Sequence, residues 1–334
     1  MPAFVPTHCP RRDCPSTTTG HFRWQHRGTY TRRCDGRPVP RFLCRECRRF
    51  FSSQTFRLDY RLKRPRLHLD LYALLVSKVT HRQAARLLGC TRGSVARRLE
   101  LLGGHARAFH LRQLERVRRR GGLTGTFQLD ELETFEHDRR LSPLTVPVLI
   151  ERGSYFVLSA QAAPLPARGR LSPARREKKA LRDRLQGLRR SGSREAVRAS
   201  LERLAGVHAG EGPVVVETDF KSTYASELER LFGERIVHLR YASSLPRKHG
   251  YPLFPINHTL AMLRDGVSRL VRRTWAASKK AACLERHLWI WIAWRNYVRG
   301  VTNQAPWTTP AMALGVLERR LEIAELCAWR VFEL

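Results

Sequence analysis

Two pairs of cysteines near the N-terminus have the spacing of metal ligands. Four residues separate Cys9 from Cys14, two separate Cys44 from Cys47, and 29 residues lie between the pairs. A structural zinc ion takes four such thiolates in a tetrahedral arrangement, and its binding supplies folding energy to segments too small for their own core. We therefore predict one structural Zn²⁺ held by these four cysteines.

Other residues of this segment offer alternative ligands. Cys34, His8 or His26 could replace one of the four, although such residues are more often bystanders. Five of the eight cysteines of the chain lie in its first 47 residues. A secreted disulfide framework would spread its cysteines through a short chain, so this clustering predicts a metal site in a reducing cytoplasm.

Two aspartates, Asp130 and Asp219, end segments that have the pattern of strands. Residues 126–130 alternate between polar and apolar side chains, and residues 213–219 resemble a short buried strand. If the two strands are neighbours, both carboxylates meet at one site that can hold two divalent ions, preferably Mg²⁺. Either aspartate alone would be explained more simply as a turn or cap residue. Nearby acids that could assist, or that simply face solvent, are Glu131, Glu133 and Glu217.

The order of the expected elements predicts the fold class. Strands are expected at 126–130, 144–150, 155–160, 213–219 and 235–239, with a β-hairpin turn at 151–154. A basic segment at about 164–206 with a helix starting at Pro173, a short helix at 224–232, and helices from about 257 complete the pattern. Strand-strand-strand-helix-strand-helix-strand-helix is an α/β order, and by analogy of element order we expect an RNase H-like fold. In that fold the strands of Asp130 and Asp219 lie side by side.

A second motif, residues 80–99, has the spacing of a helix-turn-helix. Ala84 and Ala85 would let two helices approach, Gly89 would take the turn, and Thr91 would cap a recognition helix. The side chains expected to face DNA are Arg92, Ser94, Arg97 and Arg98. The alternative is an amphipathic helical pair that packs on the rest of the chain.

The charge of the chain indicates its partner. Lys and Arg number 62 against 29 Asp and Glu, a net charge of +33, and such a surplus repels itself unless a polyanion neutralises it. Nucleic acid fits best, since the longest strongly apolar run, 288–294, is far below the roughly 18 residues that span a bilayer. Residues 287–294 are apolar on every side, which favours a buried helix over a base-stacking surface. Further basic residues expected on phosphates are Arg269, Arg272, Arg273 and Lys279.

The 334 residues suggest three domains. We predict a zinc ribbon at 1–58, a helix-turn-helix domain at 65–120, and an RNase H-like catalytic domain at 122–334. Glycines at 103, 104, 121 and 122 and the arginine-rich run 116–120 suggest a linker after the second domain. No secretory signal is visible, because residues 1–19 are polar.

Four segments resemble bacterial insertion-sequence transposases that carry a zinc ribbon and a helix-turn-helix ahead of a DDE domain. They are residues 127–131, 217–224, 254–259 and 269–280. The resemblance implies that Asp130 and Asp219 bind catalytic Mg²⁺ or Mn²⁺. The third position, usually an acid, matches Asn257, and some related transposases also have asparagine there. Asp265 or Glu285 could substitute, although Asp265 is more simply a partner of Arg269 four residues further along one helix.

This resemblance implies a transposase that binds the ends of its mobile element and catalyses DNA cleavage and strand transfer. Its expected partners are double-stranded DNA, at the element ends and at the target, and further copies of itself on that DNA. The expected location is the cytoplasm, on the nucleoid. Asn257 favours an alternative, a catalytically inactive DNA-binding protein or repressor derived from a transposase. A zinc-ribbon RNA-binding protein is disfavoured by the helix-turn-helix.

Overall fold

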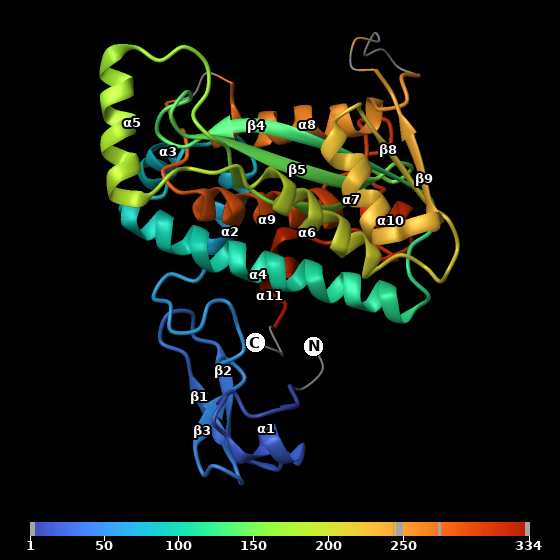
Figure 1. Cartoon of the computed structure of the whole chain (residues 1–334). Coiled ribbons are helices and arrows are strands. Elements are labelled where there is room, and N and C mark those ends of the chain that lie inside the picture. The colour runs from blue at the N-terminus through green and yellow to red at the C-terminus, as the bar shows by residue number, and fades with distance from the viewer. Residues whose placement is uncertain (1–3, 243, 245–249, 273–274, 331–334) are drawn as a thin grey trace. The chain divides into compact units, whose positions relative to one another are not determined.

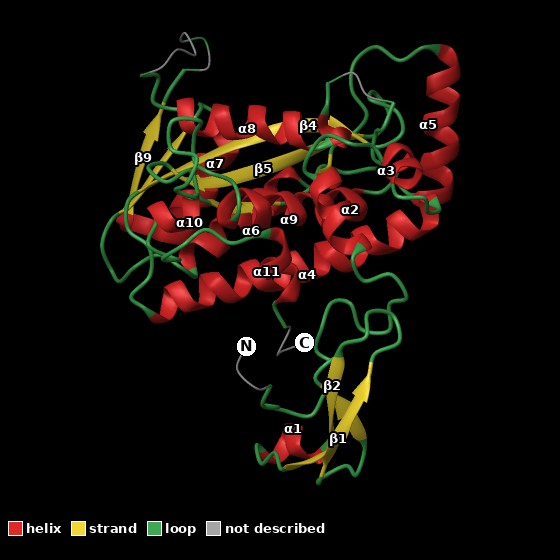
Figure 2. Ribbon diagram, turned by 180° about the vertical axis from the view of Figure 1, so that it is seen from behind, coloured by secondary structure: helices red, strands yellow, loops and turns green. Residues whose placement is uncertain are grey.

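A computed structural model of the chain describes residues 4–242, 244, 250–272 and 275–330. The chain forms two compact units (Figures 1 and 2). The small unit comprises Met1–Asp70 and Ala324–Leu334, and the large unit comprises Leu71–Ile323. The segment of the expected helix-turn-helix thus belongs to the same compact unit as the expected catalytic domain, and the three-domain scheme stays a prediction. No helix in the described ranges is long and apolar enough to cross a membrane.

The small unit is built on a three-stranded antiparallel sheet in the order β1-β2-β3. Its elements are α1 (Pro15–Thr19), β1 (Trp24–Thr31), β2 (Pro38–Cys44), β3 (Phe50–Ser52) and most of α11 (Ile323–Ala328). Phe42, Phe51 and Phe56 pack with the cysteines into one small core. The other end of the chain contributes as well, because the guanidinium of Arg330 lies 4.1 Å from the ring centroid of Phe4.

The large unit contains one mixed sheet in the order β6-β5-β4-β8-β9, with β7 paired to β5. Its strands are β4 (Thr126–Phe135), β5 (Pro143–Glu151), β6 (Val157–Ala160), β7 (Ala163–Pro164), β8 (Val214–Thr218) and β9 (Ile236–Arg240). β5 is antiparallel to β4 and β6, whereas β4, β8 and β9 run parallel. The predicted α/β class and the predicted pairing of the first and fourth strands are therefore confirmed.

Helices cover both faces of this sheet, with α6 and α7 on one side and α8 on the other (Figures 1 and 2). The α-helices of the large unit are α3 (His81–Leu87), α4 (Arg92–Arg119), α5 (Pro173–Gln186), α6 (Ser193–Ala205), α7 (Ser222–Phe232), α8 (Phe254–Gly266), α9 (Ala281–Tyr297) and α10 (Pro310–Ala313). Two 3₁₀ turns, η1 (Gly233–Arg235) and η2 (Ser268–Leu270), follow α7 and α8, and α2 (Leu67–Leu75) crosses the boundary between the units.

The first strand of the large unit is longer than its alternating pattern suggests. Parallel pairing with β8 ends at Gln128, but antiparallel pairing with β5 continues to Phe135. Asp130 consequently lies in the middle of β4, whereas the sequence had suggested that it ends the strand.

The predicted basic helix is divided into two helices, α5 and α6. Gly187, at φ 80°, ends the first of them.

The tryptophan-rich segment forms α9, and its predicted burial is confirmed. Trp289 and Trp291 are almost wholly inaccessible. Tyr72 donates a hydrogen bond to the carbonyl of Ile290, 2.8 Å away, so α9 is joined to α2. Burial also lowers the pKa of His287 to about 3, which keeps this helix uncharged at that position at neutral pH.

The linker predicted at Gly103 and Gly104 is wrong, because both glycines lie inside the 28-residue α4. At about 1.5 Å per residue this helix is about 42 Å long. A Cβ atom at Gly103 would lie 2.6 Å from the backbone oxygen of Arg286 in α9. Gly103 is therefore the point at which two helix backbones meet, and Gly121 and Gly122, at φ 105° and 83°, end the segment in the expected turn.

Gly103→Ala should destabilise the protein by about 1–3 kcal/mol, because the added methyl overlaps the α9 backbone. Gly104→Ala is the matched control, since its Cβ would meet only an Arg286 Nη1 atom at 3.9 Å. There the better helix propensity of alanine should stabilise the fold by up to about 1 kcal/mol. Denaturant unfolding of the two variants checks this, and equal effects would contradict the close approach.

A buried carboxylate joins α6 to α7. Glu227 accepts hydrogen bonds from the Nε atoms of Arg194 (2.6 Å), Arg198 (2.9 Å) and Arg230 (3.1 Å). These bonds, that from Arg198 foremost, lower the pKa of Glu227 to about 2. A carboxylate whose pKa is depressed by folding stabilises the fold above its ordinary pKa of about 4.3 and loses that effect as the pH falls towards 2.

Glu227→Gln should therefore lower the local unfolding free energy of α6 and α7 at pH 7, and its difference from the parent protein should be smaller at pH 3. Native-state hydrogen exchange of the amides in these helices measures this unfolding free energy. Glu229→Gln, at an exposed position of the same helix, should have little effect at either pH. If Glu227→Gln lowers the unfolding free energy by the same amount at pH 7 and pH 3, the charge of Glu227 does not have this role.

Candidate functional site

Asp130 and Asp219 belong to two segments that lie next to each other in the sheet. Gln128 of β4 is paired with Glu217 of β8 at the end of their parallel ladder. Asp130 lies two residues beyond Gln128 within β4 and therefore projects from the same face of that strand, whereas Asp219 directly follows Thr218, the last residue of β8.

Tyr224 of α7 is buried. Burial, and then the charges of Glu131, Asp130 and Asp219, raise the pKa of its hydroxyl. This phenol therefore remains neutral at physiological pH.

Backbone amides orient both aspartates. One oxygen of Asp130 accepts a hydrogen bond from the backbone N–H of Glu131 at 2.7 Å, and one oxygen of Asp219 accepts from the N–H of Lys221 at 3.0 Å. Bonds of this kind favour the charged form of a carboxylate and hold its second oxygen in a defined direction.

The buried side chain of Gln128 joins three elements at this site. Its Nε2 donates to Glu217 Oε2 and to the carbonyl of Pro252, both at 2.6 Å, while its Oε1 accepts from the backbone N–H of Ile256 at 2.9 Å. β4, β8 and the first turn of α8 are therefore connected through one amide. Asn257 is the next residue of that turn.

The side-chain amide of Asn257 is bonded at the start of α8. Its Nδ2 donates to the carbonyl of Leu253, the N-cap residue, at 2.9 Å. An asparagine oxygen can ligate a hard cation but adds no negative charge.

All three possible auxiliary acids have ion-pair partners. Glu217 is buried, contrary to the solvated position considered for it, and accepts a second hydrogen bond, from Arg152 Nη1 at 2.9 Å. Glu131 binds the ammonium of Lys221 and accepts from the hydroxyl of Ser193. Glu133 is exposed and pairs with Arg168.

Asp265 lies near the end of α8, about two turns beyond Asn257. Eight residues of helix separate it from Asn257, which corresponds to about 12 Å. Its carboxylate contacts Lys78 Nζ at 3.1 Å and not Arg269, so the predicted pair within one helix is wrong. The reason is that α8 ends at Gly266, and Arg269 instead turns inward to His81.

The other substitute considered for the third position, Glu285, lies on α9 beside the indole of Trp289.

The residues predicted to contact DNA differ in accessibility. Arg92, Arg97, Arg272 and Lys279 are exposed, and Ser94 and Arg98 are half-buried. Arg269 is buried, so it is not available at the surface in this arrangement. Arg273 lies outside the described residues.

The local structure expected for the helix pair is confirmed. Thr91 caps α4 by accepting a hydrogen bond from the N–H of Ser94, Gly89 has φ 54°, and Ala84 and Ala85 are buried. Thr80 and Gln83 add a reciprocal capping box at the start of α3.

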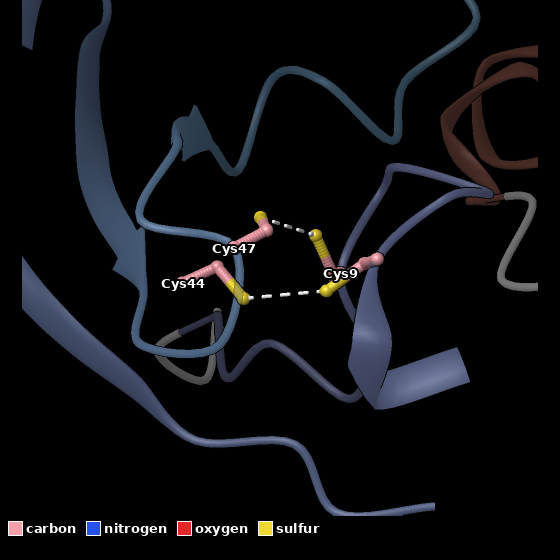
Figure 3. Close-up of side chains that lie close together, drawn as sticks. Cys9, Cys44 and Cys47 are labelled. Atoms are coloured by element: carbon pink, nitrogen blue, oxygen red, sulfur yellow. Dashed lines mark hydrogen bonds between the residues drawn. The ribbon is translucent and has the colours of Figure 1, made fainter. Parts of the chain in front are cut away.

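The four predicted thiols meet in the small unit (Figure 3). Their Sγ atoms all lie within 4.8 Å of one another, and the Cys9–Cys47 and Cys14–Cys44 pairs are each 3.7 Å apart. A tetrahedral zinc with bonds of about 2.3 Å requires sulfur atoms about 3.8 Å apart. Of the alternatives, Cys34 is exposed, His26 is exposed, and the ring of His8 packs on Phe56.

No protein-family model matches the sequence. No curated protein is similar to it either. Among solved structures, the chain is similar to the catalytic domain of Mos1 mariner transposase, with 13% sequence identity and a TM-score of 0.25, over 70% of this chain and 95% of that chain. A TM-score of this size does not establish a common fold. The evidence for the fold is instead the strand order and register of the chain itself.

Four residues that shape the acidic site were missed as site residues. They are Gln128, Arg152, Lys221 and Tyr224. The strand alternation carried a signal for the first, since Gln128 lies two residues before Asp130 on the same face. Lys221 and Tyr224 lie directly after Asp219, but which side of the following helix is buried depends on contacts that are distant in sequence.

Purified protein should contain one zinc per chain by metal analysis. Cys44→Ser should lose this metal and unfold the small unit, since the metal supplies much of the folding energy of such a segment. Cys34→Ser is the matched control and should retain the zinc, because Cys34 is exposed and lies outside the cluster. Zinc content unchanged by Cys44→Ser would exclude the site.

Proposed function

We propose that this chain is a DNA transposase with a zinc ribbon, a helix-turn-helix and an RNase H-like catalytic domain. The observation that supports the proposal is the parallel pairing of β4, which carries Asp130, with β8, which Asp219 directly follows. A net charge of +33 supports a nucleic acid as the substrate.

The strand order supports the RNase H-like assignment. Three antiparallel strands are followed by two strands parallel to the first, and the first lies in the centre between β5 and β8. The sequence resemblance expects its two metal-binding aspartates on that first strand and after its parallel neighbour. Asp130 and Asp219 occupy those positions.

Asp130, Asp219 and the carbonyl oxygen of Asn257 are the proposed ligands of Mg²⁺ or Mn²⁺. Such ions activate an attacking oxygen and stabilise the leaving oxygen of a phosphodiester. The residues of the chain itself would bind and align the DNA around that centre. Gln128 would keep Asn257 at the aspartates, because its amide bonds both β8 and the first turn of α8.

Recognition of the element ends is proposed for α3 and α4. Arg92 and Arg97 are exposed at the start of α4, as a recognition helix requires. The zinc ribbon would be a second DNA-binding module, and several copies of the chain would assemble on the element ends.

The test is cleavage of a duplex that carries the inverted repeats flanking the gene. Asp219→Ala should reduce Mg²⁺- or Mn²⁺-dependent cleavage to background while the affinity for DNA is retained, because the carboxylate holds metal and not the helix pair. Asn257→Ala should lower cleavage about 10–100-fold, the effect of losing one contact to a charged group. Asp265→Ala, on the same helix, is the control and should cleave normally.

A larger loss for Asp265→Ala than for Asn257→Ala would show that the third ligand is misplaced. The second candidate function is DNA binding without cleavage, as in a repressor derived from a transposase. The neutral Asn257 favours it, because two carboxylates hold a second divalent ion less firmly than three. Parent protein that binds the repeats but never cleaves them with either metal would establish this candidate.

A further inference from the structure

Four arginines converge on one pocket of the large unit. Its volume is 230 Å³, the space of several water molecules at about 30 Å³ each. The lining side chains are Arg139, Arg168, Arg264, Arg272, Glu133, Thr134, Phe135, Leu270 and Val271. These residues include four arginines and one glutamate, so the lining carries three positive charges in excess.

Each arginine of the pocket comes from a different segment. Arg139 lies in the β4–β5 hairpin, Arg168 follows β7, Arg264 lies in the last turn of α8, and Arg272 follows η2. Only the tertiary structure brings them together. Like charges that are held in one concavity repel each other unless an anion enters, and planar guanidinium groups match the oxygens of a phosphate.

Glu133 connects this pocket to the acidic site. A hydrogen bond from Arg168 lowers the pKa of Glu133 against the opposing effect of burial, and the charges of Lys221 and Arg139 lower it further. Lys221 lies two residues after Asp219 and also binds Glu131. Glu131 and Glu133 thus carry ion pairs with Lys221 and Arg168 on one face of β4.

The pocket lies further along two elements that also carry residues of the proposed site. Glu133 and Phe135 lie three and five residues beyond Asp130, about 10–17 Å of strand at 3.3 Å per residue, and their side chains project from the opposite face of β4. Arg264 lies seven residues beyond Asn257, about 10 Å of helix at 1.5 Å per residue. A ligand of the pocket would therefore be separate from one bound at the aspartates.

We propose that this pocket binds a single backbone phosphate of the DNA strand, separate from the phosphodiester at the aspartates. The site rests on the proposed function for the identity of its ligand as DNA. Its task is to fix the register of the strand at the metal centre. Glu133 limits the affinity of the pocket, because its carboxylate opposes the anion.

The experiment measures binding of the full-length protein to a fluorescent 30-base-pair duplex of arbitrary sequence, without added divalent metal ions so that no cleavage occurs. Each phosphate contact contributes about 0.9 to the slope of log K against log salt concentration. In the double variant Arg139→Ala with Arg272→Ala the slope should fall by about 0.9, because both arginines share one phosphate. Arg176→Ala, an exposed arginine of α5 outside the pocket, should leave the slope unchanged.

A second arm titrates the protein with inorganic phosphate by calorimetry. The parent protein should bind it, the double variant should not, and Glu133→Gln should bind it more tightly. A slope that falls by about 1.8 would mean two separate surface contacts, and an unchanged slope would mean that DNA does not enter the pocket. Either result overturns the proposal, and phosphate binding with an unchanged slope would assign the pocket to a free anion.

These results are distinguishable from failure of the proposed function. Cleavage plays no part in the salt titration, so a protein that never cuts DNA can still show the single-phosphate slope. Conversely, normal cleavage with an unchanged slope would reject the pocket and leave the catalytic proposal intact.

Discussion

The hydrogen bonds of the Gln128 side chain are the constraint on which the acidic site depends. This amide lies on the central strand of the sheet, and it bonds a neighbouring strand through Glu217 and a helix through the backbone of Ile256. A buried amide left without partners would cost about 1–3 kcal/mol, so each of these elements stabilises the position of the others. This connection fixes the first turn of α8, which contains Asn257, to β4 and β8.

Carboxylates have two different tasks in this basic protein. Glu227 and Glu217 are buried and bound by arginines. Their negative charges offset the repulsion between positively charged side chains of neighbouring elements. Asp59 does the same in the small unit, where it accepts a hydrogen bond from Arg32 at 2.8 Å. Asp130 and Asp219 also accept hydrogen bonds from the backbone amides of Glu131 and Lys221, which orient their carboxylates.

Patterns within a few residues predicted much of the fold. The alternation around Asp130 and the apolar run before Asp219 indicated the two strands that pair, and the spacing from Thr80 to Thr91 indicated two capped helices. The predictions were wrong where one residue type is compatible with more than one local structure or partner. Gly103 suggested a linker, since glycine disfavours helix, but a close crossing with α9 outweighs that preference. Asp265 matched a partner four residues away, but α8 ends before Arg269.

The sequence by itself determined the four cysteines of the metal site, the basic character of the chain and the two strands that carry the aspartates. These features depend on residue type and on short spacing, which govern local hydrogen bonds and ligand geometry. Tertiary structure alone decided that Glu217 is buried, that the C-terminal residues 324–330 join the N-terminal unit, and that four arginines share one pocket. Burial and charge clusters depend on which distant segments pack together, and no local spacing records that.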